Sequence, residues 1–480
     1  MTTAPQPPRT PPAPQPPHPR QPHPHPQQPH PQPARRAPSL TGHLAPVPDE
    51  IDGTRLAVTG MLPPELTGRY LRNGPNPRPG EDVPHWFTGP GMLHGVRLRD
   101  GRAEWYRNRW VRTRALEGVP YLDPAGRPDR AAVSANTHVI GHADKVFALV
   151  ENGFPYEVTP DLETVGPCDF GGRLTTSMTA HPKTDPATGE LLFFGYGAVP
   201  PYLTYHRLSA AGDLVESRQV EVPGGTMTHD FAITGTYAVW LDLPVVVDLA
   251  LLGRGMPYRW DDGYGARIGL MRRDDPQAAV RWFPVDPCYV FHVGNAHEDA
   301  AGRVVLDAVR YTPEVFNHFW GGIGGFVPGG FVPGGFGAAP GSTVLHRWTL
   351  DPVAGTVTGE QLDDRDVEFP THDDERTGLP SRFRYAAARD AVVKYDLERG
   401  TSAGYACGEG NAPGEAVFVP APDAGRDEDA GWLLSIVSDR AGAGSDLLVL
   451  DAHDMSRVAT VHLPRRVPVG FHGSWVPDAD

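Results

Sequence analysis

The sequence predicts an all-β fold of the propeller type. Short strand-like runs, each bounded by Gly, Pro, Asp or Asn, recur from about Leu44 onward, whereas amphipathic helical periods of useful length are scarce. About 440 residues carry this pattern, which is too long for one sandwich or small barrel but suits six to eight blades of about 40–50 residues or more. No clean internal repeat is visible, so the residues alone leave the number of blades open. The clearest runs are Val146–Val150, Leu191–Tyr196, Tyr237–Leu241, Val304–Val309, Thr343–Leu350, Trp432–Val437 and Leu447–Asp451.

Residues 1–40 differ in composition from the rest of the chain. Pro alternates there with Gln and His, four arginines are the only charged side chains, and no acidic residue occurs. Such a segment cannot bury enough apolar area to fold, so we predict an extended, disordered Pro/His-rich tail. We interpret its histidines as solvated side chains. The propeller domain is then expected to occupy residues 41–480.

The charge and cysteine content narrow the classes of function. The formal net charge of −15 disfavours nucleic acid as a partner, since phosphates require a basic surface. It equally disfavours attachment to anionic lipid by charge alone. The three cysteines (Cys168, Cys288 and Cys407) are far apart and form no CxxC pair, which indicates a reduced compartment and no thiolate metal site.

No apolar run is long enough to span a membrane. The best candidate, Val239–Leu252, is interrupted by Asp242, Pro244 and Asp248. The pair Arg35-Arg36 is not followed by the long apolar stretch of a secretion signal. We therefore expect a cytoplasmic protein.

Two segments suggest an apolar surface. Residues 312–341 contain Phe316, Phe319, Trp320 and a tandem Phe-Val-Pro-Gly-Gly, and their Pro and Gly predict neither a regular helix nor a strand. This segment is either a long surface loop or an apolar lip that touches membrane or an apolar substrate. Residues 249–256 are the best candidate for a peripheral membrane contact, and a capping loop over the propeller mouth is the alternative.

Four histidines stand in apolar or turn-like settings: His181, His229, His292 and His472. The first three are separated by 48 and 63 residues, about one blade each, and none forms the i, i+4 pair of a helical zinc site. Because the inner strand of each blade can aim a side chain at the propeller axis, histidines from different blades can converge on one metal ion at about 2.1 Å. Spacing alone is a weak signal, since a single histidine of this kind is ordinarily a core or turn residue.

The segments around these histidines resemble the carotenoid cleavage oxygenase family, in the same order and from about Gly68 to the C-terminus. The resemblance implies a seven-bladed β-propeller with loops and short helices capping its top face. The matching segments are Gly68–Pro77, His85–Gly95, Asn136–His138, Phe147–Glu157, Glu368–Pro370, Gly414–Pro420, Ser445–Asp451 and Gly470–Gly473.

The resemblance also implies the site residues. The family's four iron ligands fall on His181, His229, His292 and His472, and its three outer glutamates on Glu151, Glu368 and Glu415, which would hold the rings of His229, His292 and His472 respectively. A ligating imidazole commonly donates its other N–H to a carboxylate, which fixes the tautomer. Thr137 falls where the family can place a side chain beside the open metal position, and His94 and His297 are interpreted as structural.

The activity implied by the resemblance is a non-haem Fe(II) dioxygenase. It would insert O2 across a conjugated C=C bond of a carotenoid or apocarotenoid to give two carbonyl products, without an organic co-reductant. A long apolar polyene requires an apolar tunnel. Candidate lining residues are Phe87, Met92, Phe231, Phe291 and Phe471, and for each a place in the propeller core is the alternative.

Two other functions remain open. The first is cleavage of a stilbene, whose enzymes resemble this chain but place a lysine just before the first outer glutamate, where this chain has Val150. The second is a propeller that acts as a binding scaffold without a metal, because a fold does not determine a function. An iron assay separates the scaffold from both oxygenases.

Overall fold

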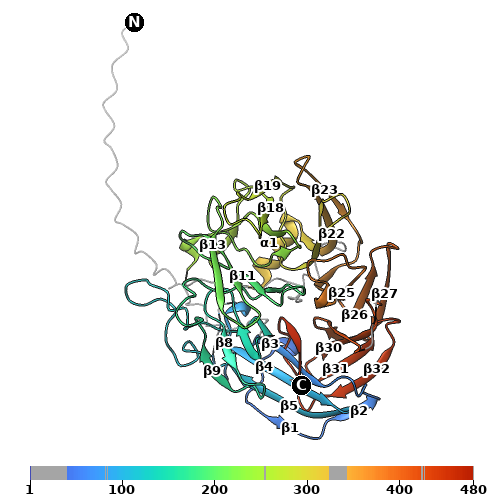
Figure 1. Cartoon of the computed structure of the whole chain (residues 1–480). Coiled ribbons are helices and arrows are strands. Elements are labelled where there is room, and N and C mark those ends of the chain that lie inside the picture. Colours follow the sequence, from blue (N-terminus) through green and yellow to red (C-terminus); the bar gives the residue numbers. More distant parts are fainter. Residues whose placement is uncertain are drawn as a thin grey trace. The chain divides into compact units, whose positions relative to one another are not determined.

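The computed structural model describes Met1 and residues 41–478, apart from residues 82, 84, 253–255, 324–342, 423–424 and 426. Seven antiparallel sheets form the seven blades of a β-propeller, so the predicted fold class is confirmed. The strands β9, β19, β23 and β27 lie at the rim of the ring of blades (Figure 1). The tail predicted for residues 1–40 lies outside the described residues and stays a prediction.

Four blades come from the first part of the chain. The first has strand order β1-β5-β4-β3-β33, with β1 Asp52–Gly53, β3 Gly68–Pro75, β4 Gly91–Arg99, β5 Arg102–Trp110 and β33 Gly473–Pro477. The second blade contains β6 His138–His142, β7 Lys145–Leu149, β8 Tyr156–Val158 and β9 Thr164–Pro167. The third contains β10 Lys183–Thr184, β11 Leu191–Tyr196, β12 Leu203–Leu208 and β13 Leu214–Gln219. The fourth contains β14 Ala232–Ile233, β15 Tyr237–Asp242, β18 Arg267–Arg272 and β19 Arg281–Pro284.

Three blades follow along the chain. The fifth blade contains β20 Val293–Glu298, β21 Val304–Tyr311, β22 Thr343–Asp351 and β23 Thr356–Gln361. The sixth contains β24 Val367–Thr371, β25 Phe383–Ala388, β26 Ala391–Asp396 and β27 Thr401–Ala406. The seventh has β2 Ala57–Gly60, β28 Asn411–Pro413, β29 Val417–Pro420, β30 Gly431–Asp439, β31 Ser445–Asp451 and β32 Arg457–His462. A small separate sheet pairs β16 Val245–Val247 with β17 Tyr258–Trp260.

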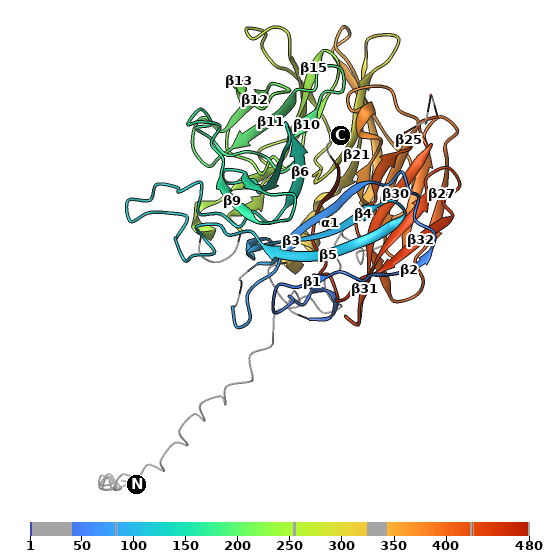
Figure 2. The ribbon, with the colours of Figure 1, turned by 60° about the horizontal axis from the view of Figure 1, so that its bottom comes forward.

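The ring is closed twice by strands from opposite ends of the chain. The last strand, β33, pairs with β3 in the first blade, where Arg72 faces Gly473. The early strand β2 pairs with β32 in the seventh blade, where Thr59 faces Thr460. Figure 2 shows the blue β2 beside the red strands of that blade. Backbone hydrogen bonds therefore hold a strand from the opposite end of the chain in each of these two blades, and the segments β2–β3 and β32–β33 connect them.

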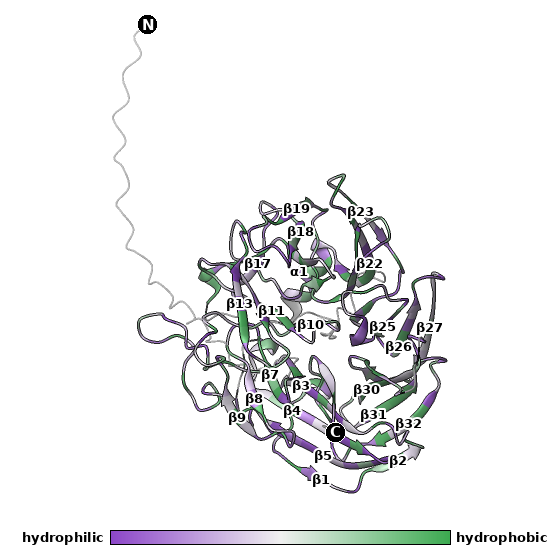
Figure 3. Cartoon of the chain, in the orientation of Figure 1, coloured by the Kyte–Doolittle hydropathy of each residue, from purple (hydrophilic) through white to green (hydrophobic). Residues whose placement is uncertain are grey.

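The hydrophobic core lies between neighbouring blades. Leu71 of the first blade packs with Val139 and Val146 of the second, and Tyr70 packs with Val461 of the seventh. Hydrophobic residues gather in the strands, and the turns between strands are mostly hydrophilic (Figure 3). Each blade is thus held by apolar contacts with its two neighbours.

The expectation that residues 312–341 lack regular structure is wrong for their first part. Pro313–Ile323 form α1, the α-helix of the described residues. Pro313 occupies the first helical position, where its missing N–H costs no hydrogen bond. The rest of the segment lies outside the described residues.

Short 3₁₀ turns complete the fold: η2 Gly42–Leu44, η3 Trp86–Thr88, η4 Leu249–Leu251 and η5 Asp374–Arg376. Of the helices that the structure describes, none has the length and apolar character needed to cross a membrane.

A substitution in the core between the first two blades tests this packing. Leu71 is fully buried, so we expect Leu71→Ala to lower the free energy of unfolding by about 2–5 kcal/mol, through lost burial and a residual cavity. Leu379→Ala, at an exposed position, is the matched control and should change stability by about 0.5 kcal/mol or less. Denaturant titration of both variants gives the comparison, and equal midpoints would contradict the inter-blade core.

Candidate functional site

Four histidines lie just before the innermost strand of four different blades. His292 and His472 immediately precede β20 and β33, while His181 lies two residues before β10 and His229 three residues before β14. Each of these strands stands at the inner end of its sheet. Corresponding positions in different blades face the same end of the propeller axis, which is why residues far apart in sequence meet.

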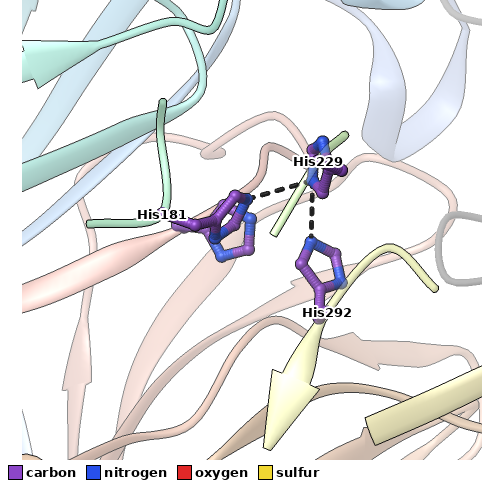
Figure 4. Close-up of side chains that lie close together, drawn as sticks. His181, His229 and His292 are labelled. Carbon is purple, nitrogen blue, oxygen red and sulfur yellow. Dashed lines mark hydrogen bonds between the residues drawn. The ribbon is translucent and has the colours of Figure 1, made fainter. Parts of the chain in front are cut away.

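The four imidazoles form one buried group. One ring nitrogen from each lies within 4.8 Å of those of the other three. Nε2 of His181 and Nε2 of His229 are 3.0 Å apart, and Nε2 of His229 and Nε2 of His292 are 3.3 Å apart. The labelled rings point toward one another (Figure 4). Two nitrogens bound at right angles to one metal ion, each about 2.1 Å from it, would be about 3.0 Å apart.

Three of the rings contact a glutamate through Nδ1. Nδ1 of His229 pairs with Glu151, Nδ1 of His292 lies 2.5 Å from Oε2 of Glu368, and Nδ1 of His472 lies 2.9 Å from Oε1 of Glu415. The structure thus brings together the three histidine–glutamate pairs that the sequence suggested. For His181, no hydrogen bond of Nδ1 is formed with the part of the chain that the structure describes.

These contacts determine which nitrogens face the centre. An ionised carboxylate can only accept, so Nδ1 of each paired ring carries the donated proton. In the neutral ring Nε2 then has a lone pair, and the Nε2 atoms of His229 and His292 face each other. One shared proton can bridge a single pair of nitrogens, whereas one metal ion can bind all four lone pairs. The donor set and its spacing fit a metal ion.

Burial and mutual proximity favour the neutral form of two of these rings. Burial, followed by the neighbouring imidazoles, lowers the pKa of His181 and of His472 well below the ordinary value. For His292, burial also opposes protonation, but the Glu368 carboxylate outweighs it and raises the pKa. Neutral imidazole is the form that binds a metal ion.

A cavity of about 1060 Å³ opens onto the group. His229, His292 and His472 form part of its wall, together with Glu151 and Glu368. Most of the remaining wall is apolar or aromatic, so the histidines lie at the side of a space large enough for an extended hydrocarbon.

The aromatic residues expected at this cavity divide into two groups. Phe87, Phe291 and Phe471 line it. Met92 and Phe231 do not: Met92 packs in a small cluster beside β5, and Phe231 stacks on Trp240 with ring centroids 5.3 Å apart. These two side chains therefore belong to the propeller core, which was the alternative to a place in the cavity wall.

Thr137 lies immediately before β6, at the position that the histidines occupy in other blades. It lines the cavity, its hydroxyl donates to Oδ1 of Asn136 over 3.1 Å, and its carbonyl accepts from the backbone N–H of His472 over 3.2 Å. Of the two histidines interpreted as structural, neither belongs to the central group: His94 is hydrogen-bonded to Tyr106, and His297 lies within β20.

Comparison with known proteins assigns the family. The model of the family described as "Retinal pigment epithelial membrane protein" matches residues 44–477. The "Carotenoid cleavage oxygenase" of Mycobacterium tuberculosis is 39% identical, with 92% of this chain and 97% of the relative covered. The chain belongs to the carotenoid cleavage oxygenase family. The resemblance to this family that the sequence motifs indicated is confirmed, and so is the prediction that the protein is a carotenoid-cleaving dioxygenase.

Two solved structures of the family share the fold. The cobalt-substituted apocarotenoid oxygenase of Synechocystis superposes with a TM-score of 0.76 at 28% identity, covering 90% of this chain and 97% of that chain. The lignostilbene dioxygenase of Pseudomonas brassicacearum superposes with a TM-score of 0.81 at 28% identity, covering 93% of this chain and 100% of that chain. A further relative, the isoeugenol monooxygenase of Pseudomonas nitroreducens, is 31% identical over 92% of this chain and 98% of its own.

In this family member, two tyrosines that the sequence did not indicate hold the glutamates. The hydroxyl of Tyr196 donates to Oε2 of Glu151, and that of Tyr311 donates to Oε1 of Glu368, each over 2.6 Å. Burial, reinforced by the adjacent carboxylate, raises the pKa of both tyrosines well above the ordinary value, so they remain donors.

A third residue that the sequence did not single out lies behind the histidines. His138 is hydrogen-bonded through Nδ1 to the carbonyl of Ala180 over 2.7 Å, and its ring centroid lies 5.1 Å from that of His472. It thereby fixes the peptide that precedes His181. A spacing pattern cannot reveal such a contact, because it joins two blades.

Removing the Tyr311 hydroxyl tests its positioning role. We expect Tyr311→Phe to weaken the binding of a divalent metal ion by about 10-fold, since partners of metal-ligating groups typically contribute 10–100-fold. Tyr385→Phe is the matched control, because the Tyr385 hydroxyl is buried and has no partner among the described residues. Bound metal per chain, measured after dialysis against a graded chelator, gives the comparison. If the two variants retain equal amounts of metal, Tyr311 does not help to position the metal-binding side chains.

Proposed function

We propose that this protein is an iron(II)-dependent dioxygenase that cleaves a conjugated C=C bond of a carotenoid or apocarotenoid with O2. The observation that carries the proposal is the group of four convergent histidines on the wall of a large apolar cavity. The names of its relatives, which include carotenoid cleavage oxygenases and an apocarotenoid oxygenase, supply the substrate class.

Four imidazole nitrogen donors suit a ferrous ion. His181, His229, His292 and His472 would hold it, and Glu151, Glu368 and Glu415 would keep three of the rings in the required tautomer. Bound there, iron(II) would supply the chemistry that allows dioxygen to react with an electron-rich alkene. A cobalt-substituted neighbour supports a metal site in the family.

The overall reaction balances without another reagent. One C=C bond and one O2 molecule give two C=O bonds, so no reductant is consumed and no proton is gained or lost. The residues of this chain would therefore act by binding and orientation rather than as acids or bases. The aromatic wall, including Phe291 and Phe471, would hold a flat polyene with one double bond beside the histidines and exclude water.

A polar side chain in the cavity favours an oxygenated substrate. Arg130 is half-buried and lines the cavity, and its guanidinium forms no hydrogen bond or ion pair with any residue that the structure describes. A carbonyl, hydroxyl or carboxylate at the end of a polyene would give it a partner. We therefore favour an apocarotenoid over a hydrocarbon carotenoid.

The stilbene-cleaving alternative has weaker support. The lignostilbene dioxygenase shares the fold as closely as the apocarotenoid oxygenase does, so overall similarity does not separate the two activities. Val150 lines the cavity next to Glu151, and its side chain has no donor or cation for a phenolic oxygen. The local chemistry at this position favours an apolar polyene.

Removal of one histidine tests the proposal. We expect His292→Ala to lose bound iron and to lower the rate of cleavage at least 100-fold, because one of four metal donors is missing. His453→Ala, on an exposed side chain away from the group, is the control and should keep both. Iron analysis is combined with chromatography of the products from a panel of carotenoids, apocarotenals and phenolic stilbenes.

Each outcome of that experiment decides between the candidate functions. Purified wild-type protein without iron, and unable to bind it, would favour the scaffold. If only the stilbenes give products, the substrate is a stilbene and not a polyene. Cleavage activity that survives in His292→Ala would refute the assigned site. With labelled dioxygen, each carbonyl fragment should carry one labelled oxygen atom.

We also propose that this enzyme is cytoplasmic and that it contacts a membrane through the rim of its cavity. Four exposed apolar side chains line that cavity: Val199 (67% exposed), Leu249 (56%), Leu252 (48%) and Leu122 (41%). Exposed leucines and valines gathered at the opening of an apolar cavity are suited to contact a lipid surface, from which an insoluble polyene can enter.

Replacing two of these leucines tests the contact. We expect Leu249→Ser combined with Leu252→Ser to weaken binding to neutral phosphatidylcholine vesicles roughly 10-fold or more, since two apolar side chains no longer enter the lipid. Val353→Ser changes a more exposed residue in the turn between β22 and β23 and should leave binding unchanged. Vesicle flotation measures both. Equal losses of vesicle binding in the double leucine variant and in Val353→Ser would contradict a membrane contact through this rim. Absence of binding by the wild type would contradict it as well.

A further inference from the structure

An interior arginine lacks the partner that its charge requires. Arg72 lies on β3 with 3% of its surface exposed, and its guanidinium forms no hydrogen bond or ion pair within the part of the chain that the structure describes. The other fully interior arginine, Arg384, pairs with Asp307 and donates to Ser381 over 2.7 Å. A guanidinium stays protonated in a protein, and an uncompensated buried charge is strongly unfavourable.

A buried carboxylate near Arg72, that of Glu415, does not supply this partner. Burial lowers the pKa of Arg72, and Glu415 is among the groups that partly offset the effect. Within the described residues Glu415 forms no ion pair with Arg72; its Oε1 accepts from Nδ1 of His472 over 2.9 Å and its Oε2 accepts from the N–H of Gly473 over 2.8 Å. The Arg72 charge is therefore felt at Glu415 but is not paired there.

A second cavity adjoins Arg72, and its wall is positively charged. It has a volume of about 20 Å³, and Arg389, Arg440 and His43 also line it. No carboxylate lines this cavity; Asp390 and Asp439 are sequence neighbours of the arginines but do not form part of its wall. Nε2 of His43 is buried and, like Nε of Arg72, has no partner among the described residues.

The size of the cavity limits what can occupy it. A cavity of about 10–15 Å³ accommodates one water molecule. The space beside Arg72 therefore suits a single atom of similar size and is too small for sulfate or phosphate. A water molecule would satisfy hydrogen bonds but would leave the charge uncompensated. A monatomic anion satisfies both requirements.

We propose that the cavity formed by Arg72, Arg389, Arg440 and His43 is a binding site for one small monovalent anion of the size of chloride. The site lies directly behind the metal-ligand group. Phe369 lines both this cavity and the large one, Gly414 adjoins Glu415, and Gly470 lies two residues before His472. The bound anion stabilises the Arg72 charge next to the Glu415–His472 pair.

Bromide is a suitable probe, because it replaces chloride and scatters anomalously. Crystals of the full-length protein, soaked in sodium bromide, should show an anomalous peak beside the Arg72 guanidinium. In solution, sodium chloride should raise the Tm above that in sodium gluconate of equal ionic strength by roughly 1–2 °C at ten times the Kd. These readouts do not depend on iron or substrate, so they can fail independently of the proposed function.

Two variants and a control separate this site from a general salt effect. Arg72→Leu should abolish the difference between chloride and gluconate while keeping or raising the Tm in gluconate. Arg440→Gln, at a half-buried position where folding is less at risk, should reduce the difference at least two-fold. Arg457→Gln, on the exposed part of β32, is the control and should leave it unchanged.

Three results would overturn the proposal. The first is water at the site without a bromide peak. The second is a chloride effect of equal size in the wild type, Arg440→Gln and Arg457→Gln. The third is a bromide peak without any chloride dependence of the Tm, which would show an adventitious ion only.

Discussion

Every part of the site depends on the way in which an antiparallel blade begins. The innermost strand of each blade starts at the same end of the propeller axis, so the residue at its start faces the centre. All seven blades contribute such a residue here, and none of these residues is close in sequence to the next: Thr137, His181, His229, His292, Glu368, Glu415 and His472. Glu151 joins them from the turn after β7, because the second strand of an antiparallel pair ends where the first begins.

Ring closure is therefore a condition for metal binding as well as for stability. His472 immediately precedes β33, and β33 is positioned by its pairing with β3. The backbone N–H of His472 also donates to the carbonyl of Thr137 in the second blade. Loss of this closure would remove one ligand and one end of the ring together. Unfolding and loss of metal should be coupled for this reason.

The sequence allowed the fold class and the central side chains to be predicted, but for different reasons. The strands follow from short runs bounded by turn residues, whereas the four histidines were recognised by their surrounding segments, since their spacing alone was weak evidence. The contacts of Tyr196 and Tyr311 could not be predicted, because each joins strands whose relative position is set by tertiary packing. The same reason explains Met92 and Phe231: an apolar residue beside a motif can face the cavity or the core, and only the packed structure decides.

The segment after Glu368 shows how the interior maintains this geometry. Phe369 has a φ of +53°, an unusual conformation for a phenylalanine, and the pairing of β24 with β25 is irregular at this point. The strain is offset locally, because the N–H of Phe369 donates to Oε2 of Glu368 over 2.6 Å and its ring stacks on His292 with centroids 5.0 Å apart. The backbone bend places the carboxylate at the Nδ1 edge of the histidine ring and the aromatic ring against its face. Side chains held in this way by hydrogen bonds and ring packing need little rearrangement when a metal ion binds, which is consistent with residues whose task is to hold and orient.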